Sequence, residues 1–131
     1  MDKPKNCISR SDAETLSKTW WESRGTAIRG AIKHEDVCAV NFSITELEEY
    51  IAYVKENSED IDGAGISIWL GSYPKDDEKV PVKKRGYSTV FLSPTKKKAA
   101  GTFSEDENDF EENEEIDPYN NGSGVWPPGV Y

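Results

Sequence analysis

The stretch GISIWL at residues 65–70 decides the fold that the sequence predicts. Its isoleucines and leucine alternate with serine and tryptophan, which is the two-residue period of a half-buried β-strand. A second apolar stretch, YSTVFLS at residues 87–93, is followed by Pro94 and predicts another strand. The charged connection between them has no helical periodicity, so we expect the two strands to be antiparallel neighbours.

Two helices are expected before these strands. The first begins at a capping box, SDAE at residues 11–14, and its apolar residues recur at helical spacing as far as Ile32. Gly25 and Gly30 each cost about 1 kcal/mol relative to alanine in a helix interior. We therefore expect this helix to bend, or to end early, near these glycines.

The second helix follows a short predicted strand, VCAVNF at residues 37–42. It begins at another capping box, SITE at residues 43–46, in which the serine and the glutamate each satisfy a free backbone N–H. Tyr50 and Tyr53 flank its apolar stripe, which consists of Ile44, Leu47, Ile51 and Val54. This strand–helix–strand passage leaves a parallel pairing open as an alternative.

These elements predict an α+β protein, with a small, largely antiparallel sheet of three to four strands and two helices packed on it. The globular domain is expected to span residues 1–103. Its core is expected to draw on apolar residues from every element, namely Leu16, Trp20, Ile28, Val40, Phe42, Leu47, Ile51, Val54, Ile66, Ile68, Leu70, Val90 and Leu92.

The chain has 131 residues and a formal net charge of −9, and the excess charge lies in one segment. Residues 104–117 hold nine acidic residues and no Lys or Arg. Without those nine, the chain has 16 acidic residues and 16 Lys and Arg residues, so the rest of the chain has no net charge by this count. We expect residues 104–117 to form an acidic arm that like-charge repulsion extends into water.

The acidic arm has two functional interpretations beside that of a solvated tether. It can bind a basic protein partner, or it can mimic a nucleic acid and occupy a phosphate-binding surface. We also expect the arm to fold partly back over two basic clusters of its own chain. These clusters are Lys83, Lys84 and Arg85, and then Lys96, Lys97 and Lys98.

Residues 118–131 form a C-terminal segment that ends in VWPPGVY. We expect it to dock on the domain, because its aromatic residues are costly to expose and its prolines favour extended backbone. The alternative is a proline-rich ligand for an aromatic groove on another protein. The candidate partner-binding residues of the arm and of this segment are Asp106, Asp109, Phe110, Glu112, Trp126 and Tyr131.

No catalytic or metal-binding motif is recognisable in the sequence. Its one histidine, His34, lies in the charged linker KHED at residues 33–36, and a solvated histidine is favoured there over a catalytic base. Residues 58–63 resemble the start of a calcium loop, but Trp69 occupies the position of the closing glutamate. The glycines of residues 63–65 follow a helix and open a strand, the reverse of a phosphate-binding loop. We expect neither a cofactor nor a resident metal.

The two cysteines, Cys7 and Cys38, show neither CxxC spacing nor a dense disulfide pattern. Cys38 lies in an apolar run and is expected to be a buried free thiol. The N-terminus lacks the apolar region of a signal peptide, and no run is long enough for a membrane span. We therefore expect a cytoplasmic protein that does not contact membranes.

Two strand motifs carry a family resemblance: GISIWLGSYP at residues 65–74 and TVFLSPT at residues 89–95. The helix motif LEEYI at residues 47–51 and the Pro-Pro segment near the C-terminus accompany them. As an ordered set these motifs resemble a family of small uncharacterised bacterial proteins of the Bacteroidota type. The resemblance covers about residues 11–95 and the last dozen residues, and it implies a bacterial protein without implying an activity.

Three classes of function follow from these observations. The favoured one is a small acidic binding or regulatory protein, which acts through protein–protein contacts and without catalysis. An acidic inhibitor or immunity-type protein that blocks a cationic or nucleic-acid-binding site is the first alternative. An enzyme or a metal-dependent small-molecule-binding protein is the second, and a pocket that holds His34 among carboxylates would favour it. A nucleic-acid partner is not expected, because the chain is acidic and has no stacking-platform motif.

Overall fold

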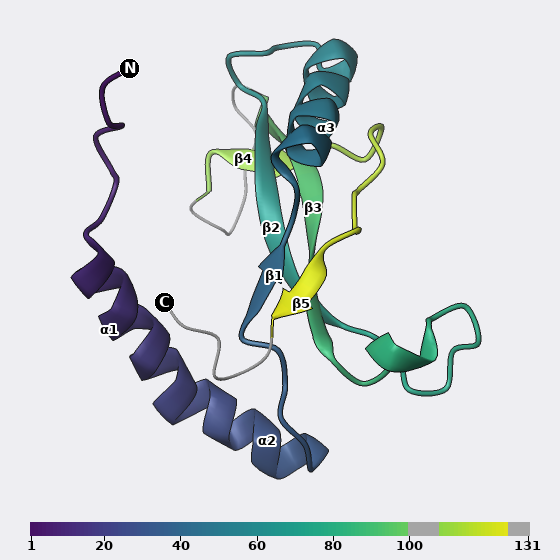
Figure 1. The fold of residues 1–131 in the computed structure, drawn as a ribbon. Coiled ribbons are helices and arrows are strands. Elements are labelled where there is room, and N and C mark those ends of the chain that lie inside the picture. The colour runs from purple at the N-terminus through teal and green to yellow at the C-terminus, as the bar shows by residue number, and fades with distance from the viewer. Residues whose placement is uncertain (100–107, 126–131) are drawn as a thin grey trace.

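A computed structural model describes residues 1–99 and 108–125 of the chain. Figure 1 shows helices and short antiparallel sheets, and this composition confirms the expected α+β class. The elements follow one another as α1 (Arg10–Trp20), a π-helical turn (Trp21–Gly25), α2 (Thr26–Ile32), β1 (Ala39–Asn41), α3 (Ile44–Asn57), β2 (Gly65–Ser72), a 3-10 turn (Val82–Lys84), β3 (Ser88–Lys97), β4 (Phe110–Glu112) and β5 (Ser123–Val125).

Strand β3 is the centre of the larger sheet, whose strand order is β2-β3-β4. The expected antiparallel pair is confirmed, since β2 runs against β3 with Ile68 opposite Leu92 and Ser72 opposite Ser88. The parallel alternative is wrong, because β1 pairs with β5 instead and forms a separate antiparallel ribbon. Gly122 is buried beside that ribbon, where a Cβ would collide with the side chains of Val40 and Phe42.

Helix α3 begins where the sequence predicts. The Ser43 hydroxyl accepts a hydrogen bond from the backbone N–H of Glu46 at 3.0 Å, which is the serine half of the capping box. The Glu46 carboxylate accepts from Asn121 at 3.1 Å, so it also links α3 to the C-terminal part of the chain. The helix buries one face against the sheet, and the buried cluster consists of Tyr50, Val54, Leu92 and Ile116, with Phe42, Leu47, Ile66 and Tyr119 packed around it.

The N-terminal helix starts earlier than predicted. Ser9, rather than Ser11, is the N-cap, and its hydroxyl accepts from the backbone N–H of Asp12 at 3.0 Å. The helix widens into the π-helical turn that ends at Gly25 and then continues to Ile32. A Cβ at Gly25 would collide with the Trp21 ring, so glycine at this position lets the indole lie against the backbone.

Several residues that the sequence assigns to the core lie at the surface. Helices α1 and α2 stand apart from the sheets in Figure 1 and contribute nothing to the buried cluster, so Leu16 is 64% exposed. Helix α3 packs on Leu92 and Ile66 and leaves the rest of β2 uncovered, so Ile68 and Leu70 are 68% and 88% exposed. Ile51 is also exposed. Val54 and Leu92 are buried as expected, and the other predicted core residues are half-buried, namely Trp20, Ile28, Val40, Phe42, Leu47, Ile66 and Val90.

The acidic segment returns to the body within its described part. Strand β4 pairs with the end of β3, with Thr95 opposite Glu112. Ile116 enters the core at 3% exposure, and Asn113 is buried and donates its backbone N–H to the Pro94 carbonyl at 2.9 Å. From Asn108 to Asp117 this segment is therefore a strand and a packed loop of the body, where a free arm was expected.

The sequence places both Leu92 and Leu16 in the core, but the structure buries Leu92 and exposes Leu16. We expect Leu92→Ala to lower the free energy of unfolding by about 2–5 kcal/mol, because it leaves a cavity among buried side chains. Leu16→Ala is the matched control and should change it by less than about 0.5 kcal/mol. Urea unfolding followed by tryptophan fluorescence measures both. Equal losses in the two variants would contradict this placement of the core.

Candidate functional site

A groove of about 320 Å³ lies between helix α3 and the segment that follows β4. We call it the tyrosine groove. One wall is the face of α3, and the other is the chain at residues 117–119. Its lining residues are Glu46, Glu49, Tyr50, Tyr53, Asp117, Pro118 and Tyr119.

The α3 wall follows from helical spacing. Positions 46, 49, 50 and 53 are separated by three and four residues, so their side chains share one face of the helix. This face lies beside the apolar stripe that carries Leu47 and Val54 into the core. Tyr50 belongs to both faces, since its ring is buried and its hydroxyl reaches the opposite wall.

The opposite wall is positioned by backbone hydrogen bonds to β3. Leu92 and Tyr119 exchange two N–H to C=O bonds, each 2.8 Å long, which fixes Tyr119 at the edge of the sheet. The Tyr50 hydroxyl donates to the backbone carbonyl of Asp117 at 2.9 Å and ties the two walls together. Because three independent elements meet at these bonds, the groove is preformed by the fold.

Three tyrosine rings line the groove and lie close to one another. The Tyr50 and Tyr119 ring centroids are 5.2 Å apart with planes 29° from parallel, and Tyr53 lies 6.0 Å from Tyr50. Phe42 extends the cluster on the core side, 6.1 Å from Tyr119. The face of an aromatic ring carries partial negative charge and attracts cations.

Three carboxylates add formal negative charge to the same place. Glu49 and Asp117 are exposed at the groove, and Glu46 is half-buried. The lining residues that the structure describes include no lysine, arginine or histidine. Carboxylates beside electron-rich rings suit a positively charged group, so the chemistry of this groove favours a cationic ligand.

The same surroundings act on Tyr50 itself. Burial raises the pKa of the Tyr50 phenol above its ordinary value of 10.0, and negative charge at Tyr53, Asp117 and Glu112 raises it further. At neutral pH the phenol is therefore protonated and remains a hydrogen-bond donor to the Asp117 carbonyl. Tyr50 holds the groove together and is not available as a base.

The candidate residues of the acidic arm have structural partners where they are described. The Glu112 carboxylate accepts from the Ser93 hydroxyl at 2.6 Å and from the Trp69 indole N–H at 3.3 Å. The Asp109 carbonyl accepts from the backbone N–H of Lys98 at 3.0 Å, and the Phe110 side chain is 45% exposed. The other three candidates, Asp106, Trp126 and Tyr131, lie outside the described residues.

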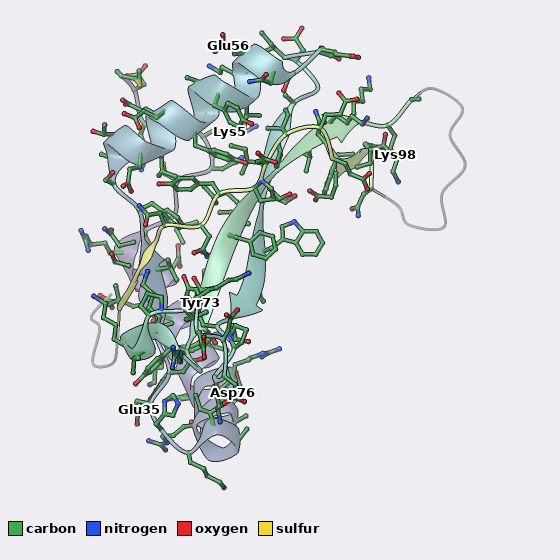
Figure 2. All side chains as sticks on the ribbon, turned by 90° about the vertical axis from the view of Figure 1, so that its right-hand side faces the viewer. Lys5, Glu35, Glu56, Tyr73, Asp76 and Lys98 are labelled. Carbon is green, nitrogen blue, oxygen red and sulfur yellow. The ribbon has the colours of Figure 1, made fainter. Side chains whose placement is uncertain are left out.

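The two basic clusters lie in different places relative to the acidic segment. Lys96 and Lys97 of β3 pair through their backbones with Glu111 and Phe110 of β4. Figure 2 shows Lys98 and Tyr73 at opposite ends of the sheet, and Lys84 lies over the Tyr73 ring at 5.8 Å.

The second cluster has its own partners at that far end. Arg85 donates from Nε to the Val80 carbonyl at 2.9 Å, and the Lys83 side chain is exposed. Within residues 1–99 and 108–125, no hydrogen bond or ion pair joins residues 83–85 to the acidic segment. The described part of the arm, residues 108–117, therefore runs beside one cluster, whereas the sequence predicts that the arm folds over both.

His34 packs against Tyr87, with ring centroids 4.7 Å apart, and its Nδ1 lies 2.9 Å from the Glu35 carbonyl. The buried carboxylate of Asp36 accepts hydrogen bonds from the backbone N–H groups of Val37 and Ser88 and from the Ser88 hydroxyl. Both oxygens of Asp36 thus hold the linker onto β3. This geometry favours a structural role for the linker.

Neither cysteine forms a disulfide: Cys7 is exposed, and the half-buried Cys38 donates its thiol to the Val125 carbonyl at 3.3 Å. Across the described parts of the chain, no three His, Cys, Asp or Glu side chains gather closely enough to hold a metal ion. The same residues include no helix with the length and apolar character that a bilayer crossing requires.

Sequence reasoning identifies half of the tyrosine groove and misses the other half. Tyr50 and Tyr53 are recognisable as aromatic residues beside the stripe of α3. The sequence assigns Asp117 to the acidic arm and Tyr119 to the C-terminal segment, because no local pattern indicates that this part of the backbone bonds to β3. No protein-family model, curated protein or solved structure matches this chain.

The raised pKa of Tyr50 gives the stability of the protein a testable pH dependence. The unfolded chain loses this phenolic proton near pH 10, before the folded chain does, so the stabilisation is complete below pH 10 and declines above it. At about pH 8 we expect Tyr50→Phe to lower the free energy of unfolding by about 1 kcal/mol through the lost hydrogen bond. The gap between wild type and variant should narrow at about pH 11.

Urea unfolding at the two pH values measures this gap, with Tyr53→Phe as the matched control for removal of a neighbouring hydroxyl. A gap that is unchanged or wider at the higher pH would contradict this role of Tyr50.

Proposed function

We propose that this chain is a non-catalytic protein-binding protein, which uses the tyrosine groove to hold a lysine or arginine side chain of a basic protein partner. The observation that carries this proposal is the meeting of three carboxylates and three tyrosine rings in one preformed groove. A cation over an aromatic face gains about 0.5–2 kcal/mol, depending on how far it is desolvated. Adjacent carboxylates add directional hydrogen bonds to the same cation.

The distribution of charge supports the same partner. The whole excess of negative charge lies in residues 104–117, and this segment leads directly into the groove wall at Asp117. Glu114 and Glu115 are exposed beside that wall. An acidic field concentrated at the mouth of a groove speeds the approach of a basic partner and orients it there.

An acidic inhibitor that blocks a cationic site is the second candidate. It is favoured by the placement of residues 108–117, because β4 and the Leu92–Tyr119 bonds hold the carboxylates of this part of the acidic segment along one edge of the body. A prearranged row of carboxylates binds with less loss of conformational entropy than a free tail. A tight, salt-sensitive complex of one copy with one partner distinguishes the inhibitor from a weaker binding module.

A hexa-arginine peptide tests the groove directly. We expect it to shift the backbone NMR signals of Glu49, Tyr53 and Tyr119 more than those of the remaining acidic surface. The double variant Glu49→Gln, Asp117→Asn should raise the dissociation constant roughly tenfold, because two charges beside the bound cation are lost.

The matched control is Glu48→Gln, Glu115→Gln. It removes the same charge from the same two elements, but both residues lie outside the groove lining. The control should raise the dissociation constant less than about threefold, through the general field alone. Equal weakening in both double variants would show that the peptide responds to net charge and would overturn the groove as the binding site.

A further inference from the structure

Strand β2 is a long edge strand with an uncovered apolar surface. It contains eight residues, GISIWLGS, of which none is charged and none is proline. One edge pairs with β3 over the whole length of β2, and β2 is the outermost strand of the sheet order. The exposed fractions of Ile68, Trp69 and Leu70 are 68%, 46% and 88%.

The backbone of β2 presents free hydrogen-bonding groups on its outer edge. Leu92 directs its N–H and C=O to Tyr119, away from β2. Its cross-strand neighbour Ile68 therefore belongs to a non-hydrogen-bonded pair, and the backbone groups of Ile68 point outward. By alternation those of Ile66 and Leu70 point outward as well.

Natural sheets protect such edges with charges, proline, bulges or a covering element. Strand β2 has no charge and no proline, and its register with β3 is continuous from Gly65 to Ser72, without a bulge. An unprotected apolar edge in a chain that is 31% charged indicates a surface kept free for pairing with another strand.

We propose that β2 pairs antiparallel with β2 of a second copy of this chain, about a twofold axis that passes beside Trp69. The two three-stranded sheets then join into one continuous sheet of six strands. The occupant is a second copy because the strand complements itself. A twofold pairing about Trp69 places Ile68 against Leu70 and Trp69 against its own copy, and it brings no charged side chain of either strand into the contact.

The register about Trp69 follows from the exposed side chains. Ile68 of one copy lies opposite Leu70 of the second copy, so the two most exposed aliphatic residues of the strand cover each other. Their outward backbone groups then exchange hydrogen bonds across the twofold axis. Trp69 lies opposite Trp69 of the second copy, in a non-hydrogen-bonded pair where side chains approach most closely.

The surroundings of Trp69 prepare it for this contact. Its ring stacks on Phe91 of β3, with centroids 6.2 Å apart and planes 7° from parallel, and its indole N–H donates to Glu112. The ring is thus oriented before association, which lowers the entropy cost of ordering it at an interface. Pairing extends the two-ring stack into a four-ring ladder across the joined sheets.

This surface is independent of the tyrosine groove. The groove wall joins β3 at the edge opposite β2, through the Leu92–Tyr119 bonds. A dimer formed through β2 therefore leaves both grooves open, and failure of either proposal leaves the other intact.

The oligomeric state of the full chain tests the proposal. Sedimentation equilibrium should give twice the chain mass of 14.7 kDa for the wild type at high concentration. Leu70→Lys places a charge in the pairing edge and should raise the dimer dissociation constant roughly 100-fold. The matched control Val82→Lys changes another exposed apolar residue, 76% exposed and outside β2, and should leave the dimer unchanged.

Disulfide trapping tests the register. In a chain with Cys7→Ser and Cys38→Ala, Trp69→Cys should form a covalent dimer, because paired Cα atoms about 4.5 Å apart lie within disulfide reach. Ser72→Cys is the control, since its two copies would be separated by about 20 Å. The proposal would be overturned if the wild type stayed monomeric. It would also be overturned if Leu70→Lys and Val82→Lys had the same dimer dissociation constant, or if Trp69→Cys and Ser72→Cys formed covalent dimers equally.

Discussion

The exchange of two backbone hydrogen bonds between Leu92 and Tyr119 is the constraint on which the rest of the structure depends. It attaches the returning chain to the free edge of β3, so that Ile116 enters the core and Asp117 meets the Tyr50 hydroxyl. Without it, α3 would cover the sheet alone and the tyrosine groove would lack one wall. The two bonds also determine which residues of β3 direct their N–H and C=O groups away from β2. Because β2 pairs with β3 in a fixed register, they determine as well which backbone groups of β2 point outward.

The sequence predicts well the elements whose signals are local. The α3 cap at Ser43 and the alternation in β2 and β3 lie within a few residues of the structure they encode, and both are confirmed. The N-terminal cap is missed by two residues, because Ser9 and Ser11 are both competent caps and a local pattern does not choose between them. The antiparallel pairing of β2 with β3 follows from the absence of a crossover helix.

The rest of the fold depends on contacts between distant residues. Strands β4 and β5 are short and lie in acidic or glycine-rich sequence, so their pairing rests on backbone groups that every residue carries. The alternation of residues in β2 is the same as in any half-buried strand, so the sequence alone does not tell which of its apolar residues are covered. Which residues are covered is decided by α3, which packs on Leu92 and leaves Ile68 and Leu70 exposed. The tyrosine groove shares this origin, since Tyr119 reaches α3 only after the chain has returned to β3.

The two sides of the central strand β3 differ in charge. One edge is closed by the chain's own acidic segment, and the other is β2, which carries no charge. This division matters because two copies with a net charge of −9 repel each other wherever their acidic surfaces approach. Of the acids in residues 108–117, Glu112 reaches β2, where its carboxylate accepts from the Trp69 indole N–H, and Asp117 lines the groove on the other side of β3. The two proposals thus rest on one arrangement of charge: β2 carries none, which suits the proposed pairing with a like-charged copy, and the acidic segment leads to the groove that we propose for a basic partner.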